Sequence, residues 1–455
     1  MDVTRDPDIR VAHARDASGL ELVPEAVARA STAQDVIELV REVGAAGGAV
    51  TPAGSQTSMT GASITDRGVL LSLKPMSRII DIDVARRIAR VEPGVRIGEL
   101  NRAIAGEGLL FAPDPTSEED ATIGGAIACN ASGARSLHYG ATRSHVNGVR
   151  VIHADGSDAW YHRFRPEKNA VGYFAAQDPV DWFVGSEGTL GVMVEAKLSL
   201  VSLPASTIGL AIPFTTLDSA LDFIVAARES AMRSPLCLEV FDKEALAIAS
   251  TSARNPFGAD ATALVYLEDD AGVENELDPL LAFWFEIAEA HSAVTGDIRA
   301  YQGAGDLRDA RVMRHAVPST MNERGAAFRS HGGRKVSTDW AVPYRRLREA
   351  LEVSRQAVER HGAPHPVTYG HAGNGHPHQN FIAEDADALE RINAAIEETL
   401  RLVVSLGGTV SAEHGLGKLK RGWLDLQMSR RQIDVMKAMK SALDPAGMFS
   451  PGNIL

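Results

Sequence analysis

Three glycine-rich tracts in the first 200 residues constrain most strongly what this chain can fold into. They are AVTPAGSQTSMTGAS at 49–63, the segment from Phe111 to Arg143, and GSEGTLG at 185–191. The second tract has apolar residues too few and too interrupted to predict a packed core element, and long coil inside a compact domain is usually functional. A plain surface turn is the alternative for the first tract alone. Three such tracts together suggest a long cofactor lying on backbone N–H groups.

The segments around these tracts predict strands and one early helix. Strands are expected at 69–73, 87–91 and 192–200, and a hairpin joins 149–154 to 159–164 across Asp155-Gly156. An amphipathic helix is expected at 31–46, with Ser31 and Gln34 as its capping box.

The pattern changes after Leu203-Pro204, which predicts a domain boundary there. Strands at 208–214 and 262–267 alternate with helices that begin near residue 217 and at about residue 275. This order predicts an antiparallel α+β layer. No G-x-G-x-x-G lies between a strand and a helix, and the P-loop motif is absent, so a Rossmann site is not expected.

Composition narrows the class of protein. The chain has 455 residues, 45% of them apolar, and a formal net charge of −13, which argues for two domains and against a nucleic-acid binder. Cys129 and Cys237 are the only cysteines, so no disulfide framework is expected and a cytoplasmic location fits. No apolar run reaches the roughly 18–20 residues of a membrane span, which leaves only peripheral contact with the inner membrane open.

The segment YGHAGNGHPHQN, residues 369–380, contains three histidines. Glycines and a proline separate them, so a turn rather than helical spacing must set their distance. A divalent metal site needs three or four N or O ligands. Glu413 is the natural further ligand, because it follows a helix predicted at 388–406 and a short strand at 409–412. His414 adjoins it as a candidate base. The alternative is that these histidines are polar loop residues satisfied by their neighbours.

Two basic positions could bind an acidic group. Arg314 lies on a helix predicted around 309–315, and Lys335 opens a strand predicted at 335–343. A guanidinium offers a planar fork to a carboxylate, and an ammonium offers a point charge. Taken singly, each fits a solvated surface charge better, and the binding role depends on their lying close to the histidines.

Together these segments resemble the FAD-linked oxidase family of D-lactate dehydrogenases, the glycolate oxidase flavin subunit and D-2-hydroxyglutarate dehydrogenases. The matching tracts are PAGSQTSMTGA, VEPGV, DPTSEEDATIGGAIACNASGARSLHYG, GSEGTLGV, KVSTDWAVP, GHAGNGHPH, SAEHGLGKLK and DPAGMFSPGNIL. The resemblance implies an α+β chain of the vanillyl-alcohol oxidase type. Its parts would be a PCMH-type FAD-binding domain at 1–204, a substrate domain with the metal site at 205–425, and a C-terminal segment at 426–455 that packs back on the first domain.

The resemblance also implies a flavin site. The family's pyrophosphate loop falls on Pro52, Gly54, Ser55, Gln56, Thr57, Ser58 and Gly61. Its isoalloxazine and ribityl bed falls on Pro113, Asp114, Thr116, Gly124, Gly125, Ala128, Asn130, Gly133, Tyr139 and Gly140. The adenosine side falls on Glu187, Gly188, Gly191 and Val192, and the returning tail on Asn453.

The substrate side follows from the same resemblance. The family's metal ligands match His371, His378 and Glu413, and its base matches His414. Arg314 and Lys335 match residues that hold the substrate carboxylate, and Asn380 matches a polar contact near the metal. The chain departs from the family at His376, where relatives usually have asparagine.

The expected activity is FAD-dependent oxidation of a D-2-hydroxy acid, D-lactate or a close analogue, to the 2-oxo acid. A divalent metal (Zn, Mn or Fe) would assist hydroxyl deprotonation while hydride passes to flavin N5. Glycolate or D-2-hydroxyglutarate oxidation, or a non-redox flavin-dependent synthase, are alternatives within the fold, and a flavin-free metallohydrolase or a binding protein lies outside it. The electron acceptor (a cytochrome, a quinone or an electron-transfer flavoprotein) and a homodimeric state are left open.

Overall fold

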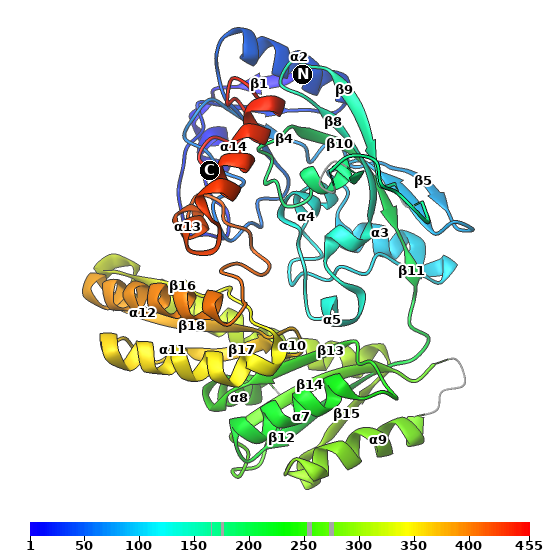
Figure 1. Ribbon diagram of the computed structural model, residues 1–455, viewed down its shortest axis with the longest axis vertical. Coiled ribbons are helices and arrows are strands. Elements are labelled where there is room, and N and C mark those ends of the chain that lie inside the picture. Colours follow the sequence, from blue (N-terminus) through cyan, green and yellow to red (C-terminus); the bar gives the residue numbers. More distant parts are fainter. Residues whose placement is uncertain (165, 174–176, 253–256, 273–276) are drawn as a thin grey trace. The chain divides into compact units, whose positions relative to one another are not determined.

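A computed structural model of the chain describes residues 1–164, 166–173, 177–252, 257–272 and 277–455, coloured along the sequence in Figure 1. The chain forms two compact units. Unit 1 comprises Met1–Gly133, Gly140–Leu203 and Glu413–Leu455, and unit 2 comprises Ala134–Tyr139 and Pro204–Ala412. Across the described ranges, no helix is both long enough and apolar enough to cross a bilayer.

Unit 1 contains two main sheets and one short ribbon. The first sheet has the order β1 (Asp2–Thr4), β2 (Ala26–Arg29), β4 (Val69–Ser72), β3 (Val50–Ala53), and β4 pairs in parallel with both its neighbours. The second is antiparallel, in the order β5 (Ile79–Asp83), β6 (Ile88–Val91), β10 (Val192–Ser199), β8 (Val146–Ile152), β9 (Asp158–His162). The ribbon pairs β7 (Leu109–Leu110) with β11 (Val201–Ser202). The strands and the hairpin predicted for this part of the chain are confirmed.

The helices in the described part of unit 1 are α1 (Pro7–Ala12), α2 (Ala33–Ala45), α3 (Ile97–Ile104), α4 (Ile123–Cys129), α13 (Leu424–Gln427) and α14 (Arg430–Leu443), with 3₁₀ turns at Ala105–Glu107, Thr142–His145, Pro179–Trp182 and Arg421–Trp423. The predicted α2 is confirmed, but its capping box is made by Thr32 and Asp35. The expected pair Ser31 and Gln34 is wrong by one residue, because the helix begins one residue later.

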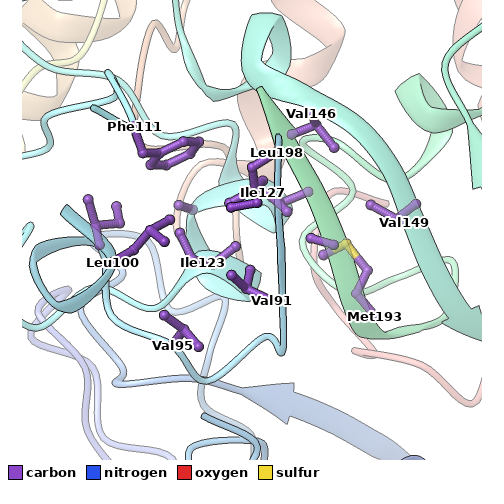
Figure 2. Close-up of a cluster of buried hydrophobic side chains, with 14 of the residues drawn as sticks. Val91, Val95, Leu100, Phe111, Ile123, Ile127, Val146, Val149, Met193 and Leu198 are labelled. Atoms are coloured by element: carbon purple, nitrogen blue, oxygen red, sulfur yellow. The ribbon is translucent and has the colours of Figure 1, made fainter. Parts of the chain in front are cut away.

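Helix α4 contradicts the expectation that tract 111–143 holds no packed core element. The side chains of Ile123, Ala126 and Ile127 are buried, and Figure 2 shows Ile123 and Ile127 among apolar side chains from β6, β8 and β10. These positions are spaced i, i+3, i+4, so two turns suffice to present one apolar face. The hydroxyl of Thr122 accepts the N–H of Gly125 at one end, and Asn130, in the left-handed region at φ 50°, ends the helix.

The C-terminal segment is hydrogen-bonded to the first sheet of unit 1. Val50 donates its N–H to the carbonyl of Met448 at 3.0 Å, and Ser450 donates its own to Val50 at 2.9 Å. The Asn453 amide donates to the carbonyls of Ala62 and Glu187. Residues near the end of the chain are thus hydrogen-bonded to strand β3.

Unit 2 is built on one antiparallel sheet of seven strands. Their order is β15 (Arg299–Gln302), β12 (Thr207–Phe214), β14 (Ala263–Asp270), β13 (Cys237–Phe241), β17 (Val367–His371), β18 (His376–Asp385), β16 (Gly332–Ser337). The helices are α5 (Ser136–Tyr139), α7 (Leu217–Glu229), α8 (Lys243–Ser252), α9 (Leu277–Ala290), α10 (Gly303–Ala326), α11 (Leu347–His361) and α12 (Ala386–Ser405), with 3₁₀ turns at Thr295–Asp297, Arg329–His331, Tyr344–Arg346 and Ala372–Asn374. Strand β14 is buried on both faces along most of its length, as expected for a sheet covered on both sides.

The predicted strands and helices of this unit are largely confirmed, with three differences. The helix expected from residue 275 is described from Leu277, because residues 275 and 276 lie outside the described residues. Strand β16 ends at Ser337 rather than continuing to residue 343. The strand expected at 409–412 is a single bridge between Thr409 and Ala341, because the chain makes no second pair there.

Candidate functional site

The three histidines lie on a tight β-hairpin formed by β17 and β18. His371 and His376 are directly opposite each other, and Tyr369 is opposite His378. The turn needs Gly375, whose φ is 68° and where a Cβ would lie 1.9 Å from the carbonyl oxygen of Val342. The prediction that a turn sets the distances between the histidines is confirmed.

The register places the three imidazoles on one face of the sheet. Cross-strand partners share a face, and so do residues two apart on one strand, such as His376 and His378. The ring centroids are 5.6 Å apart for His371 and His376, 5.2 Å for His371 and His378, and 4.5 Å for His376 and His378. The sequence signal that brings the three histidines together is therefore their alternation along the strands, and not the glycines between them.

The donor atoms suit a divalent metal. One ligand atom from each of His371, His376, His378 and Glu413 lies within 4.8 Å of the others. Glu413 directly follows Ala412, whose N–H donates to the carbonyl of Asp339, and its carboxylate accepts the Ser132 hydroxyl. Atoms that each lie about 2.0–2.2 Å from a shared ion are at most about 4.4 Å apart, so a small inward shift suffices. Imidazole and carboxylate donors fit Zn, Mn or Fe.

A carboxylate that lies beside the hairpin was not predicted from the sequence. Glu239 lies on β13, in the register that puts it beside His371, and its Oε1 is 2.8 Å from Nδ1 of that histidine. A single charged residue in the apolar strand CLEVF was the available signal, because a buried charge must be paired. Asp339 is fully buried, and its Oδ1 lies 3.3 Å from Nε2 of His376.

Arg314 joins this cluster from helix α10. Its guanidinium is paired with Glu239, lies 3.7 Å from Oε1 of Glu268 and stacks over the ring of Tyr266. Arg135 donates to Glu268 from the other side at 2.8 Å. Burial alone would raise the pKa values of Glu239 and Glu268, but the guanidinium groups outweigh it and both pKa values are lowered. The alternative of a solvated surface charge is therefore wrong for Arg314.

Lys335 and Asn380 lie on the same sheet face as the histidines. Lys335 is opposite Ile382 and Ser337 is opposite Asn380. Burial lowers the pKa of Lys335, which has no ion-pair partner in the part of the chain that the structure describes. The Asn380 amide donates to the hydroxyl of Tyr369 at 2.8 Å, while its buried Oδ1 accepts no hydrogen bond from the described residues.

The residues expected to hold the phosphates follow strand β3 in unit 1. Gln56 has a φ of 58°, and its side chain bonds to His13 through both polar atoms. A Cβ on Gly54 would lie 2.2 Å from Oγ1 of Thr122, so Gly54 permits a close approach inside the protein itself. Of the rest of this group, Pro52 lies in β3 itself, and Ser55, Thr57, Ser58 and Gly61 lie in the loop that follows the strand.

The remaining flavin positions also lie in unit 1, apart from Tyr139, which belongs to unit 2. A Cβ on Gly133 would meet the carbonyl of Asp114 at 2.1 Å, and one on Gly124 would meet Pro93 at 2.7 Å. These glycines therefore have packing reasons as well as the expected ligand role. The others in unit 1 are Pro113, Thr116, Gly125, Ala128, Asn130, Gly140, Gly188, Gly191 and Val192.

Glu187 and Asn453 are occupied by bonds within unit 1. The Glu187 carboxylate accepts the N–H groups of Leu416 and Gly417 at 2.7 and 2.8 Å, and burial raises its pKa to about 7. The Oδ1 of Asn453 accepts a hydrogen bond of 2.7 Å from the ammonium of Lys418. The candidate base His414 precedes this loop, and its carbonyl accepts the Thr60 hydroxyl.

Two family models match the chain. One, the FAD binding domain, matches residues 24–159, and the other, the C-terminal domain of FAD linked oxidases, matches residues 203–454. The second covers more than half of the chain, which therefore belongs to the FAD-linked oxidase family.

Curated relatives agree with this family, and a solved structure shares the fold. The chain is 30% identical to the glycolate oxidase subunit GlcD of Bacillus subtilis, over 89% of this chain and 83% of that protein. It is 28% identical to a D-2-hydroxyglutarate dehydrogenase of Stutzerimonas stutzeri, over 95% of this chain and 91% of that protein. A solved alkyldihydroxyacetonephosphate synthase shares the fold, with a TM-score of 0.73 at 18% identity over 99% of this chain and 82% of that one. The predicted family and the PCMH-type α+β fold are confirmed, and the chain is an FAD-linked oxidoreductase.

Proposed function

We propose that this protein is an FAD-dependent dehydrogenase that oxidises a D-2-hydroxy acid, D-lactate or a close analogue, to the 2-oxo acid. The observation that carries the proposal is the cluster of His371, His376, His378 and Glu413 in a chain of the FAD-linked oxidase family. A hydroxy acid offers a carboxylate and a hydroxyl, and this cluster shares its sheet face with Lys335 and Asn380.

Each side chain has a proposed task in this reaction. FAD, when bound, supplies the acceptor for the hydride from the substrate Cα. His371, His378 and Glu413 would hold a divalent metal, which lowers the pKa of a coordinated hydroxyl. His414 would take the hydroxyl proton on a ring nitrogen. The buried, unsatisfied Oδ1 of Asn380 would accept a hydrogen bond near the metal.

The substrate carboxylate needs a cation. Lys335 is largely buried and has no ion-pair partner among the described residues, so its ammonium is assigned the main contact. Arg314, the other expected contact, is already paired with Glu239 and lies near Glu268. Its Nε is committed to Glu239, so a substrate carboxylate would be contacted through its Nη groups.

The proposal is tested by anaerobic titration of the purified holoenzyme while flavin absorbance is followed. D-Lactate should bleach the flavin and L-lactate should not. Glycolate and D-2-hydroxyglutarate form the comparison panel, because relatives carry the names of enzymes for them. Chelator treatment should abolish bleaching and added divalent metal should restore it. A flavin that no D-2-hydroxy acid reduces would refute the proposal.

The variant Lys335→Met gives the residue-level test. Loss of the carboxylate partner should raise the D-lactate concentration needed for half-maximal bleaching by about 10–100-fold, since a charge-assisted contact of about 1.5–3 kcal/mol is removed. Arg334→Met, which removes the exposed neighbouring charge, is the matched control and should leave the titration unchanged.

A further inference from the structure

We infer that His376 is a third histidine ligand of the metal centre, and that Glu239 and Asp339 are the carboxylates that orient His371 and His376 for ligation. The inference rests on the proposed metal-assisted function and extends it. It adds the third histidine of the hairpin to the ligand set. It also gives a positioning role to two buried carboxylates of unit 2.

The first carboxylate–histidine pair is built into the sheet. Glu239 on β13 lies opposite His371 on β17, with 2.8 Å between Oε1 and Nδ1. The other carboxylate oxygen of Glu239 is paired with Arg314, which itself lies near Glu268. The Glu239 side chain is only 6% exposed. Its contact with Arg314 holds the carboxylate in position beside His371.

The second pair has the same form on different elements. Asp339 follows β16 and is fully buried, and its Oδ1 lies 3.3 Å from Nε2 of His376. Its other oxygen accepts the Ser411 hydroxyl at 2.6 Å, and its carbonyl accepts the N–H of Ala412. The peptide that leads into Glu413 is therefore anchored on the residue that faces His376.

A carboxylate beside one ring nitrogen favours the tautomer that carries the proton on that nitrogen. This tautomer would leave the lone pair that a metal requires on Nε2 of His371 and on Nδ1 of His376. Two of the three clustered histidines each lie beside a buried carboxylate. Metal-binding histidines commonly have such a carboxylate next to the ring nitrogen that does not bind the metal. A histidine that only fills space in a core needs no such partner.

The test is Zn²⁺ affinity, measured on FAD-loaded protein by competition with a chromophoric chelator. Glu239→Gln and Asp339→Asn should each weaken Zn²⁺ binding by about 10–100-fold, the usual effect of losing an outer-shell partner. His376→Asn, which installs the family's usual residue, should also weaken it. The matched control is Asp269→Asn, another buried carboxylate of unit 2, which accepts Nε1–H of Trp284 and should leave the affinity unchanged.

The outcomes separate the possible roles. A merely structural role for Glu239 or Asp339 would lower the melting temperature of the metal-free variant while its Zn²⁺ affinity equals that of wild type, and this would overturn the inference. Unchanged affinity in His376→Asn would remove His376 from the ligand set. If Glu239→Gln does not fold, the other two variants decide. Wild type that binds no metal yet is bleached by D-lactate would overturn this inference and the metal's part in the proposed function, but not the dehydrogenase activity. Metal binding without bleaching would overturn the proposed function and leave this inference standing.

Discussion

Replacing Arg314 by methionine should leave a buried carboxylate without its ion-pair partner. Glu239 and Glu268 are each 6% exposed, and Arg314 lies between them at 14% exposure. Glu268 keeps Arg135, so the loss falls mainly on Glu239. Breaking a buried ion pair by removing one partner costs about 3–5 kcal/mol. For a domain of this size that corresponds to a fall in melting temperature of roughly 6–20 °C.

The pH dependence identifies the cause. Both carboxyl pKa values are lowered in the native protein, so their contribution to stability is present above the ordinary carboxyl range and is lost as the pH falls through the native pKa values. Without Arg314, burial is expected to raise the pKa of Glu239, and stability then falls as the pH rises above about 4.5. The gap between wild type and Arg314→Met should be widest at neutral pH and should narrow toward pH 4.

The assay is urea and thermal unfolding with chelator present, followed by the fluorescence of tryptophan. Trp284 and Trp340 are fully buried in unit 2 and should report on it. Arg308→Met removes an exposed arginine from the same helix and should change stability by less than about 0.5 kcal/mol. Equal losses in the two variants, or a gap that does not depend on pH, would refute the reasoning.

Two further substitutions probe the turn and the C-terminal segment. Gly375→Ala should lower the free energy of unfolding by about 2–4 kcal/mol and reduce the metal bound per chain, because the residue has a left-handed backbone and its Cβ would clash with the carbonyl of Val342. A variant with wild-type stability and metal content would contradict this prediction. Lys440→Met should lower the free energy of unfolding by about 3–5 kcal/mol and speed flavin loss on dialysis, because the ammonium donates hydrogen bonds to the buried carboxylate of Asp444 and to two backbone carbonyls. An unchanged melting curve for unit 1 would count against this prediction.

Local patterns in the sequence were sufficient for the elements that were predicted in unit 1. Strands β4, β6 and β10, the β8–β9 hairpin and helix α2 follow from period and turn chemistry within about ten residues. The histidine hairpin could be located for the same reason, because glycines and a proline exclude a helix. The short helix α4 was missed because two turns give too few apolar repeats to stand out from a glycine-rich tract.

The surroundings of the histidines could not be predicted locally. Glu239 reaches His371 across 132 residues of chain, because β13 pairs with β17 in a sheet order that runs β14-β13-β17-β18-β16. Nothing in the sequence near either residue specifies that register. The pairing of Arg314 with Glu239 depends in turn on how α10 packs on this sheet. The donors were therefore predictable, and the carboxylates that orient them were not.

The bonds between β3 and residues 448–450 have a consequence for synthesis of the chain. Translation delivers the N-terminal strands first, yet Val50 finds its partners Met448 and Ser450 only after most of unit 2 has been synthesised. The N-terminal part of unit 1 is thus made before unit 2 and gains these hydrogen bonds after it.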